Sequence, residues 1–394
     1  MKMKPAEFIA LSACTMTLTA LGIDIMLPAL GAIRQDFGLD PQSTVTSKII
    51  SFFFMGQVAQ IFFGILSDRF GRIAILRVGF PLYIIGGITA ALAPDFPLML
   101  TARFVAGVGA SAVFMTTVAG VRDRFVGDQM ARIMSLIFTI FLFTPIIAPF
   151  LGLAILSVWS WKMVFLTPPL FAIMVFVWSL RLEESHPAEK RSTFHWNQIF
   201  SEFRNVLTNR IFLKYTGITT ALFTALSSYV ASSEHIVGDI YGKPKWFAWI
   251  FAGIGSIMSL CSLLNSYLSA RYGASQTVKG LLILYTAVSG LLLVLTLNWG
   301  DPPDIFIFFI SVGILMGINV AIEPNSSALA LEPFGNFAGL ASAMYGTFFF
   351  FTGGFLGSVI SSLMAKEVFP IVLSLFLIGL TSLLLVLRNR SPQI

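Results

Sequence analysis

Charged residues are scarce in this chain. They make up 11% of its 394 residues, whereas 56% are hydrophobic. A soluble domain carries about a quarter charged residues and needs them on its water-facing surface, so the shortage predicts an integral membrane protein. The formal net charge of +6 does not indicate nucleic-acid binding, because the cations lie in short loops rather than on one face. We therefore expect the lipid bilayer as a partner and no nucleic acid.

Cysteine and histidine are also rare. Cys14 and Cys261 both lie inside apolar runs, which is typical of small core residues rather than of a disulfide or a metal pair. The three histidines are His186, His195 and His235. No constellation of a nucleophile or of metal ligands joins them, although a metal role for Glu234 with His235 is left open. We expect no enzymatic activity, no cofactor and no metal site.

Long apolar runs, in contrast, fill most of the chain. A membrane-spanning helix needs about 20 largely apolar residues, and twelve segments meet this requirement. They are approximately residues 7–30, 46–66, 74–94, 97–120, 131–156, 161–181, 211–232, 246–269, 279–298, 304–323, 337–358 and 367–387. The predicted fold class is all-α integral membrane, with twelve transmembrane helices.

A short basic turn occurs twice. Residues 64–72 read Gly-Ile-Leu-Ser-Asp-Arg-Phe-Gly-Arg, and 202 residues after its Leu-Ser pair residues 268–273 read Leu-Ser-Ala-Arg-Tyr-Gly. The only long polar stretch, residues 183–209, divides the spans into six and six. Such a repeat predicts a duplicated architecture: an N-terminal six-helix bundle over 1–183, a linker over 184–209 and a C-terminal six-helix bundle over 210–394. Apolar residues at helical spacing in the linker predict an amphipathic helix at the membrane surface, which we interpret as a tether.

Lysine and arginine are unevenly distributed over the loops. With the N-terminus inside the cell, 18 of the 25 lie on the inner side and 6 on the outer side, and Arg103 lies within a span. Inner loops carry an excess of Lys and Arg, so both termini are predicted to be cytoplasmic.

A few ionisable residues lie at membrane depth, where each costs roughly 2.5–3.5 kcal/mol on insertion scales. Asp24 and Arg103 fall at similar depth in the first and fourth spans, so we expect them to pair. A static salt bridge is the simple interpretation, but a permanent buried ion pair is often no better than an apolar replacement, which favours a functional role. Glu323 lies one turn after Asn319, and Glu234 ends the seventh span, where it is equally well explained as a solvated helix end.

Prolines and phenylalanines add two further predictions. Pro145 and Pro149 lie one turn apart in the fifth span and are followed by Gly152, so we expect a kink and close packing there. The chain has 39 phenylalanines, which suit a pocket for an amphipathic organic molecule better than a hydroxyl-lined sugar site.

Several of these segments resemble a known family. Residues 64–77 resemble the signature loop of the major facilitator superfamily, residues 103–109 are similar to its helix 4 motif, and residues 145–152 resemble the helix 5 motif of its drug:proton antiporters. Residues 22–30, 121–123, 131–135 and 338–343 resemble the Bcr/CflA branch of twelve-span multidrug exporters. Two positions depart from that branch, because Glu234 stands where a proline is expected and Glu323 where an apolar residue is expected.

The resemblance implies two pseudo-symmetric bundles that rock around a central cavity, with Asp24 and Arg103 coupling transport to protons. The residues that it places in the substrate cavity are Asp24, Arg103, Glu234, Asn319, Glu323 and Asn325. Those that it places in a cytoplasmic gate are Gly64, Asp68, Arg69, Gly71, Arg72, Arg77, Arg122 and Asp123. The helix 5 kink would comprise Pro145, Pro149 and Gly152.

We therefore expect a monomeric transporter of the bacterial inner membrane that exports small amphipathic compounds such as antibiotics by antiport with protons. Its energy source would be the proton gradient. A proton-coupled importer of a small metabolite or a siderophore on the same fold is the alternative, and the antiporter-like segment 145–152 argues against it. A channel or a sensor that does not transport is a third possibility, which the duplicated turn disfavours.

Overall fold

The computed structural model describes residues 3–40, 44–125, 127–187, 189, 196–364 and 366–388. These residues contain helices and no strand. They form two compact units, Met1–Pro41 with Lys48–Phe200 and Gln42–Ser47 with Ser201–Ile394. The boundary falls inside the stretch predicted as the linker, and the short segment 42–47 belongs to the second unit, where Thr44–Ser47 packs against α10 (Arg210–His235) and α15 (Gly353–Ser362).

The first unit holds eight longer helices: α1 (Pro5–Asp24), α2 (Leu30–Asp36), α3 (Lys48–Gly56), α4 (Gln60–Phe70), α5 (Arg72–Ala91), α6 (Phe96–Arg124), α7 (Gly127–Leu156) and α8 (Trp161–Ser179). Within it, α6 packs against α5 and α3, and α1 packs against α7 and α8. The helix α9 (Trp196–Thr208) lies at the boundary between the units.

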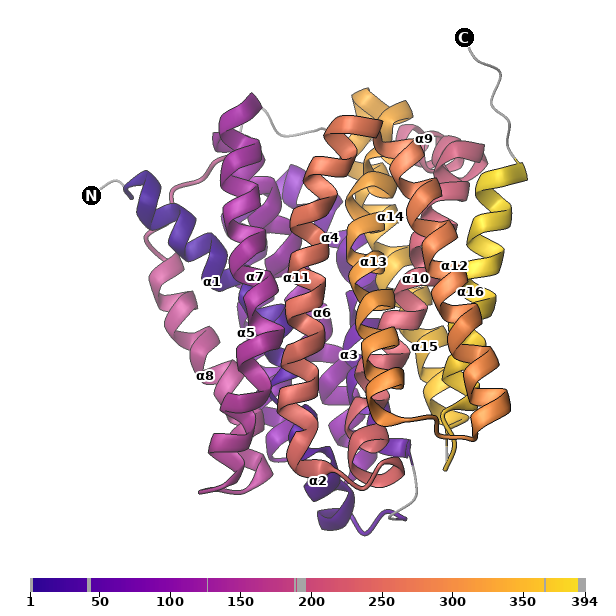
Figure 1. Cartoon of the computed structure of the whole chain (residues 1–394). Coiled ribbons are helices and arrows are strands. Elements are labelled where there is room, and N and C mark those ends of the chain that lie inside the picture. The colour runs from indigo at the N-terminus through magenta and orange to yellow at the C-terminus, as the bar shows by residue number, and fades with distance from the viewer. Residues whose placement is uncertain are drawn as a thin grey trace. The chain divides into compact units, whose positions relative to one another are not determined.

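The second unit adds six helices to α10. They are α11 (Phe247–Tyr272), α12 (Ala274–Trp299), α13 (Ile305–Leu331), α14 (Ala338–Thr347), α15 and α16 (Phe369–Arg388). Here α13 lies between α11 and α12, and α10 packs against α13, α15 and α16 (Figure 1).

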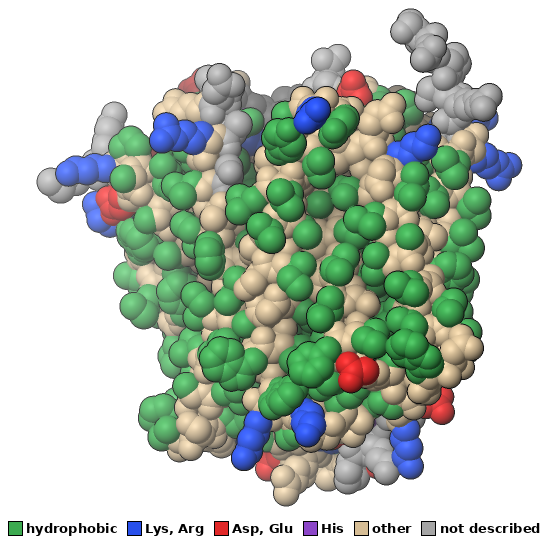
Figure 2. Space-filling view, viewed as in Figure 1, with side chains coloured by type: hydrophobic (Ala, Val, Ile, Leu, Met, Phe, Trp, Pro, Cys, Tyr) green, Lys and Arg blue, Asp and Glu red, His purple; other side chains and the backbone are tan. Residues whose placement is uncertain are grey.

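The described residues contain eleven helical segments that are long and apolar enough to cross a membrane. They coincide with eleven of the twelve predicted spans, and the remaining prediction, 211–232, falls in α10. That helix is less apolar because it carries four threonines and four serines. Hydrophobic side chains cover the helices along their length, and Lys and Arg lie near the helix ends (Figure 2). The predicted all-α membrane fold is confirmed.

The first span is not one continuous helix. α1 ends at Asp24, and a single 3-10 turn, Leu27–Ala29, leads into α2. Pro28 lacks an N–H group, and in a continuing helix its ring would clash with the carbonyl of the residue four positions earlier, which is Asp24. The proline therefore ends α1 at the acidic residue and leaves the backbone there irregular.

α7 reaches this irregular backbone through a glycine. A Cβ atom at Gly152 would lie 2.0 Å from the carbonyl oxygen of Ile25, closer than any real contact. Pro145 and Pro149 both lie inside α7, which runs as one helix through them. Gly152 thus allows α7 to pack directly on the segment that follows Asp24.

The repeated turn has the same backbone in both units. Gly71 ends α4 with φ 93° and Gly273 ends α11 with φ 76°, a region in which residues other than glycine are strained. The N–H of each glycine donates to a serine carbonyl, that of Ser67 at 3.1 Å and that of Ser269 at 2.9 Å. The duplication that the sequence predicts is therefore present in the chain's conformation.

We predict that Gly152→Ala destabilises the protein by about 1–3 kcal/mol, because the new methyl group overpacks the contact with Ile25. The measurement is the thermal unfolding midpoint in detergent. Gly217→Ala is the control, since a Cβ at Gly217 in α10 meets no atom within 4 Å and removing a helical glycine stabilises by up to about 1 kcal/mol. Equal midpoints for the two variants would contradict the close approach.

Candidate functional site

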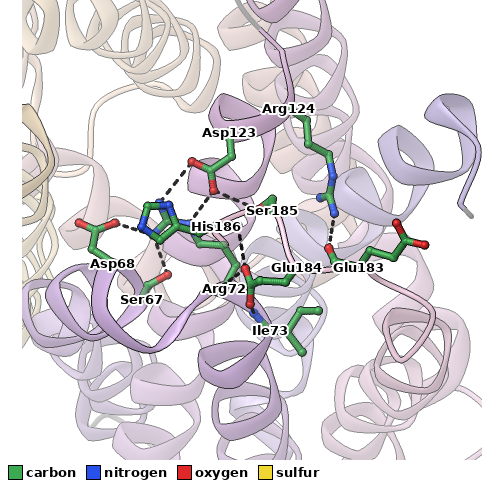
Figure 3. A network of polar contacts seen from close by, with 10 residues as sticks. All are labelled: Ser67, Asp68, Arg72, Ile73, Asp123, Arg124, Glu183, Glu184, Ser185 and His186. Atoms are coloured by element: carbon green, nitrogen blue, oxygen red, sulfur yellow. Dashed lines mark hydrogen bonds and ion pairs between the residues drawn. The ribbon is translucent and has the colours of Figure 1, made fainter. Parts of the chain in front are cut away.

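Arg72 is the centre of a polar network in the first unit (Figure 3). Its Nε and Nη2 donate to Asp123 at 2.8 and 3.3 Å. Its Nη1 donates to Ser67 at 3.0 Å and to Asp68 at 2.6 Å. Ser67 and Asp68 come from α4 and Asp123 from α6. Because Arg72 is only 8% exposed, one buried guanidinium at the start of α5 ties the ends of three helices together.

Glu184, which follows α8, caps the N-terminus of α5. Its carboxylate accepts from the backbone N–H of Arg72 at 2.9 Å and of Ile73 at 3.1 Å. The first N–H groups of a helix lack intrahelical partners and form the positive end of its dipole, so a carboxylate there is stabilising. Ser185 joins the network by donating to Asp123 at 3.0 Å. Neither Glu184 nor Ser185 was predicted from the sequence, where the signal for them is the acidic pair at 183–184 directly after the sixth span.

The structure brings only some of the predicted gate residues into this network. Asp68, Arg72 and Asp123 form the network, and Gly71 sets the turn between α4 and α5. Arg77 and Arg122 are exposed and form no hydrogen bond or ion pair with any described residue, so they lie outside the network. The two remaining predicted residues lie in α4: Gly64, and Arg69, whose guanidinium lies 5.4 Å from the Phe70 ring centre.

The equivalent place in the second unit has a neutral network. Ser269 and Asn325 lie 202 residues after Ser67 and Asp123. The hydroxyl of Ser269 donates to Asn325 Oδ1 at 2.7 Å, and Asn325 Nδ2 donates to Asn265 Oδ1 at 2.7 Å. The amide of Asn325 therefore occupies the position of the Asp123 carboxylate, and it links α11 to α13 through hydrogen bonds between neutral groups.

This arrangement changes the interpretation of Asn325 and Asn319. Asn325, predicted to line the substrate cavity, uses its amide oxygen and nitrogen in the neutral network. Asn319 Nδ2 donates to the carbonyl oxygen of Leu222 at 2.6 Å, which ties α13 to α10. Both side chains are buried and hold helices together, so we leave them out of the substrate site proposed below.

Arg103 binds the end of α1. Its Nη2 donates to the carbonyl oxygen of Gly22 at 2.8 Å and its Nε to that of Ile49 at 3.4 Å. Its guanidinium also lies over the Phe53 ring, 4.5 Å from the ring centre. The last carbonyls of a helix lack intrahelical partners and carry negative partial charge. Arg103 thus supplies the partner that Gly22 loses because α1 ends at Asp24.

The predicted pairing of Asp24 with Arg103 is wrong for this structure. Asp24 is 5% exposed and forms no hydrogen bond or ion pair with any described residue. The pair does not form because α1 ends at Asp24 and leaves the carbonyl of Gly22 without an intrahelical partner. The guanidinium of Arg103 donates to that carbonyl instead of to the Asp24 carboxylate. Tyr83, which was not predicted from the sequence, holds the same helix one turn earlier by donating to the carbonyl oxygen of Leu18 at 2.8 Å.

The remaining predicted cavity residues lie in the second unit. Glu323 in α13 accepts from the hydroxyl of Tyr345 in α14 at 3.3 Å. Glu234 lies in the last turn of α10, next to His235, whose Nδ1 lies 2.7 Å from Asp239. Their convergence with Asp24 and Arg103 on one cavity stays a prediction. Among the residues that the structure describes, no group of three or more His, Cys, Asp or Glu side chains is placed to hold a metal ion.

A small cavity lies beside Arg72 in the first unit, with Thr117 and Arg124 among the lining residues. Its volume is about 20 Å³, and about 10–15 Å³ is enough for one water molecule. It is therefore too small to hold an organic substrate.

Comparison with known proteins identifies the family. The model of the Major Facilitator Superfamily matches residues 12–358. The chain belongs to the major facilitator superfamily. The human organic anion transporter MFSD10 has the same fold, with a TM-score of 0.74 at 15% identity over 98% of this chain and 100% of that one. A D-xylose–proton symporter matches with a TM-score of 0.73 at 14% identity over 96% and 97% of the two chains. These low identities show the fold alone.

Relatives found by sequence similarity show to which branch of the superfamily the chain is similar. A bicyclomycin resistance protein homolog of Haemophilus influenzae is 29% identical over 368 residues, which cover 91% of this chain and 89% of the relative. The multidrug resistance protein MdtL of Escherichia coli O157:H7 is 27% identical over 345 residues, covering 86% and 85%. They confirm the predicted resemblance to the Bcr/CflA branch. This major facilitator protein is a multi-pass membrane transporter of a small molecule, not an enzyme.

We predict that Asp123→Ala costs about 3–5 kcal/mol of stability, because it leaves the buried guanidinium of Arg72 without a main partner. The measurement is the thermal unfolding midpoint of the purified protein. Arg77→Ala is the control, since the exposed Arg77 forms no such contact and surface changes stay within about 0.5 kcal/mol. A similar loss in both variants would show that the network does not hold α5 to α6.

Proposed function

We propose that this transporter exports small amphipathic organic compounds across the bacterial inner membrane in exchange for protons. The relatives are named for resistance to bicyclomycin and to multiple drugs, and export is the transport direction that protects a cell from a drug. The high phenylalanine content supports an apolar, aromatic substrate. In this proposal the protein acts as a monomer and needs only the proton gradient as its energy source.

The observation that carries proton coupling is the position of Asp24. Its carboxyl is buried at membrane depth and has no cationic partner among the described residues. An ionised carboxylate there is costly unless it is paired. The C-terminal carbonyls of α1 carry negative partial charge, which further disfavours a second negative charge. A protonated Asp24 satisfies both constraints, so this residue is the proposed proton carrier.

The contact between Arg103 and Gly22 suggests how a proton moves the helix. When Asp24 is protonated, Arg103 binds the carbonyl of Gly22, as observed. When Asp24 loses its proton, its carboxylate competes for the same guanidinium, because two opposite full charges in a low-dielectric interior attract more strongly than a cation and a carbonyl dipole. We propose that Arg103 exchanges one partner for the other and thereby shifts the irregular segment after Asp24. Gly152 of α7, which packs on that segment, would transmit the shift.

The network around Arg72 is the proposed gate. The excess of lysine and arginine in the loops on this side supports a cytoplasmic location for this end of the first unit and for both termini. The Asp68 carboxylate accepts from Arg72 at 2.6 Å and its side chain is 45% exposed, so in this proposal it is the group that exchanges partners during transport. Asp123 and Ser67 would keep Arg72 in place meanwhile.

We predict that Asp24→Asn abolishes the coupling of transport to protons. Asparagine has a similar shape but cannot bind and release a proton near neutral pH, so substrate uptake into everted vesicles should fall to that of empty vesicles. The assay is uptake of a panel of antibiotics, including bicyclomycin, under an imposed pH gradient, together with the release of protons when substrate is added.

The control for this experiment is Glu332→Gln, which makes the same chemical change at an exposed acid. It should transport like the wild type. Full proton-coupled transport by Asp24→Asn would assign the proton to another acid. Transport by the wild type that is independent of pH for every compound would overturn the antiport mechanism itself.

A further inference from the structure

Glu323 is a second acid that lies in a span and forms no ion pair with any described residue. Its carboxyl group accepts from the hydroxyl of Tyr345 at 3.3 Å. The hydroxyl of Ser327, one turn later in α13, donates instead to the carbonyl oxygen of Pro324 at 3.2 Å. Within the described part of the chain, no Lys, Arg or His forms an ion pair with Glu323. The hydroxyl of Tyr345, a neutral donor, therefore orients this carboxyl group, and no described cation pairs with it.

Aromatic rings continue directly from this carboxylate. The ring of Tyr345 stacks on Phe349, with 6.1 Å between centres and 12° between planes. Phe349 contacts Phe223 of α10 at 4.3 Å between centres, and Phe350 lies edge-on to both, at 4.9 Å from Phe349 and 5.1 Å from Phe223. An acid and four rings thus come together from α13, α14, α10 and the segment after α14.

The segment that carries Phe349 has an unusual backbone. Residues Phe348–Thr352 form a π-helical turn between α14 and α15, and such turns often occur at functional sites. Directly after this turn, Gly353 at the start of α15 contacts α10, because Ser227 donates to its carbonyl oxygen at 2.9 Å. A Cβ at Gly353 would lie 2.7 Å from the ring of Phe223. This close approach fixes the aromatic rings relative to each other.

We infer that Glu323, Tyr345 and Phe349 bind the positively charged head of a hydrophobic organic cation. The carboxylate supplies the opposite charge, and the faces of the rings attract a cation through their quadrupoles. Glu323 and Phe349 are only half-buried, so the pair is accessible. A metal ion would need several oxygen ligands, whereas a carboxylate beside aromatic rings matches an ammonium or phosphonium group. The inference rests on the proposed export function and names one class of its substrates.

The test uses purified protein and two probes of similar shape. Tetraphenylphosphonium is a lipophilic cation, and triphenylphosphine oxide is its neutral counterpart. We expect Glu323→Gln to weaken equilibrium binding of tetraphenylphosphonium at least about tenfold, because a desolvated charge partner is lost. Binding of the neutral probe should not weaken. Phe349→Leu keeps the charge and should weaken binding of the cation about threefold through the lost ring face.

One control and one further variant of the site complete the test. Glu332→Gln makes the same substitution at an exposed acid and should bind the cation like the wild type. Tyr345→Phe keeps the ring and removes the hydroxyl that orients Glu323, so it should weaken cation binding while preserving the unfolding midpoint. Equal affinity of the wild type and Glu323→Gln for the cation, or no binding of it by the wild type, would overturn the inference.

Failure of the export proposal has a different signature. If the wild type binds tetraphenylphosphonium through Glu323 but shows no proton-coupled movement of any compound, the cation site stands and the antiport function fails. If the wild type exports neutral compounds with protons and Glu323→Gln has no effect on the cation, the antiport function stands and the cation site fails.

Discussion

A polar group that is buried between helices is shielded from water, so its partner has to come from the chain itself. Arg72 binds the side chains of Asp123, Asp68 and Ser67, and Arg103 binds the backbone carbonyls of Gly22 and Ile49. In each case the partners come from other helices. Satisfying one buried cation therefore also fixes the packing of the helices around it.

The two units meet this constraint with different chemistry on the same backbone. The turns at Gly71 and Gly273 share a left-handed glycine and the same hydrogen bond to a serine carbonyl. Next to them the first unit ties its helices with carboxylates and a guanidinium, and the second with Asn325 and a serine. Other charges and water strengthen or break an ion pair, whereas a hydrogen bond between neutral side chains depends little on nearby charges. The first unit is thus the one whose tie is suited to switching.

Asp24 and Glu323 lie within spans and form no ion pair with any described residue, and each is close to irregular backbone. α1 ends at Asp24, and the π-helical turn after α14 carries the ring that stacks on the partner of Glu323. Irregular backbone in a span is tolerated where the protein itself supplies the missing partners. It also moves at less cost than a continuous helix, because fewer intrahelical hydrogen bonds have to be broken. The proposals above assign the proton to the first acid and the substrate charge to the second.

By itself, the sequence determined the apolar spans, the repeated turn and the family, because these depend on local properties. A span needs about 20 apolar residues in a row, and a left-handed turn needs glycine wherever it occurs. It also showed that Asp24, Arg103 and Glu323 are out of place in a membrane. Tertiary structure alone decided their partners: Arg103 binds Gly22 instead of Asp24, Glu184 caps a helix 112 residues earlier, and Tyr345 orients Glu323. Partner choice depends on which backbone carbonyls and donors lie within about 3 Å, and that distance is set by helix packing rather than by spacing along the chain.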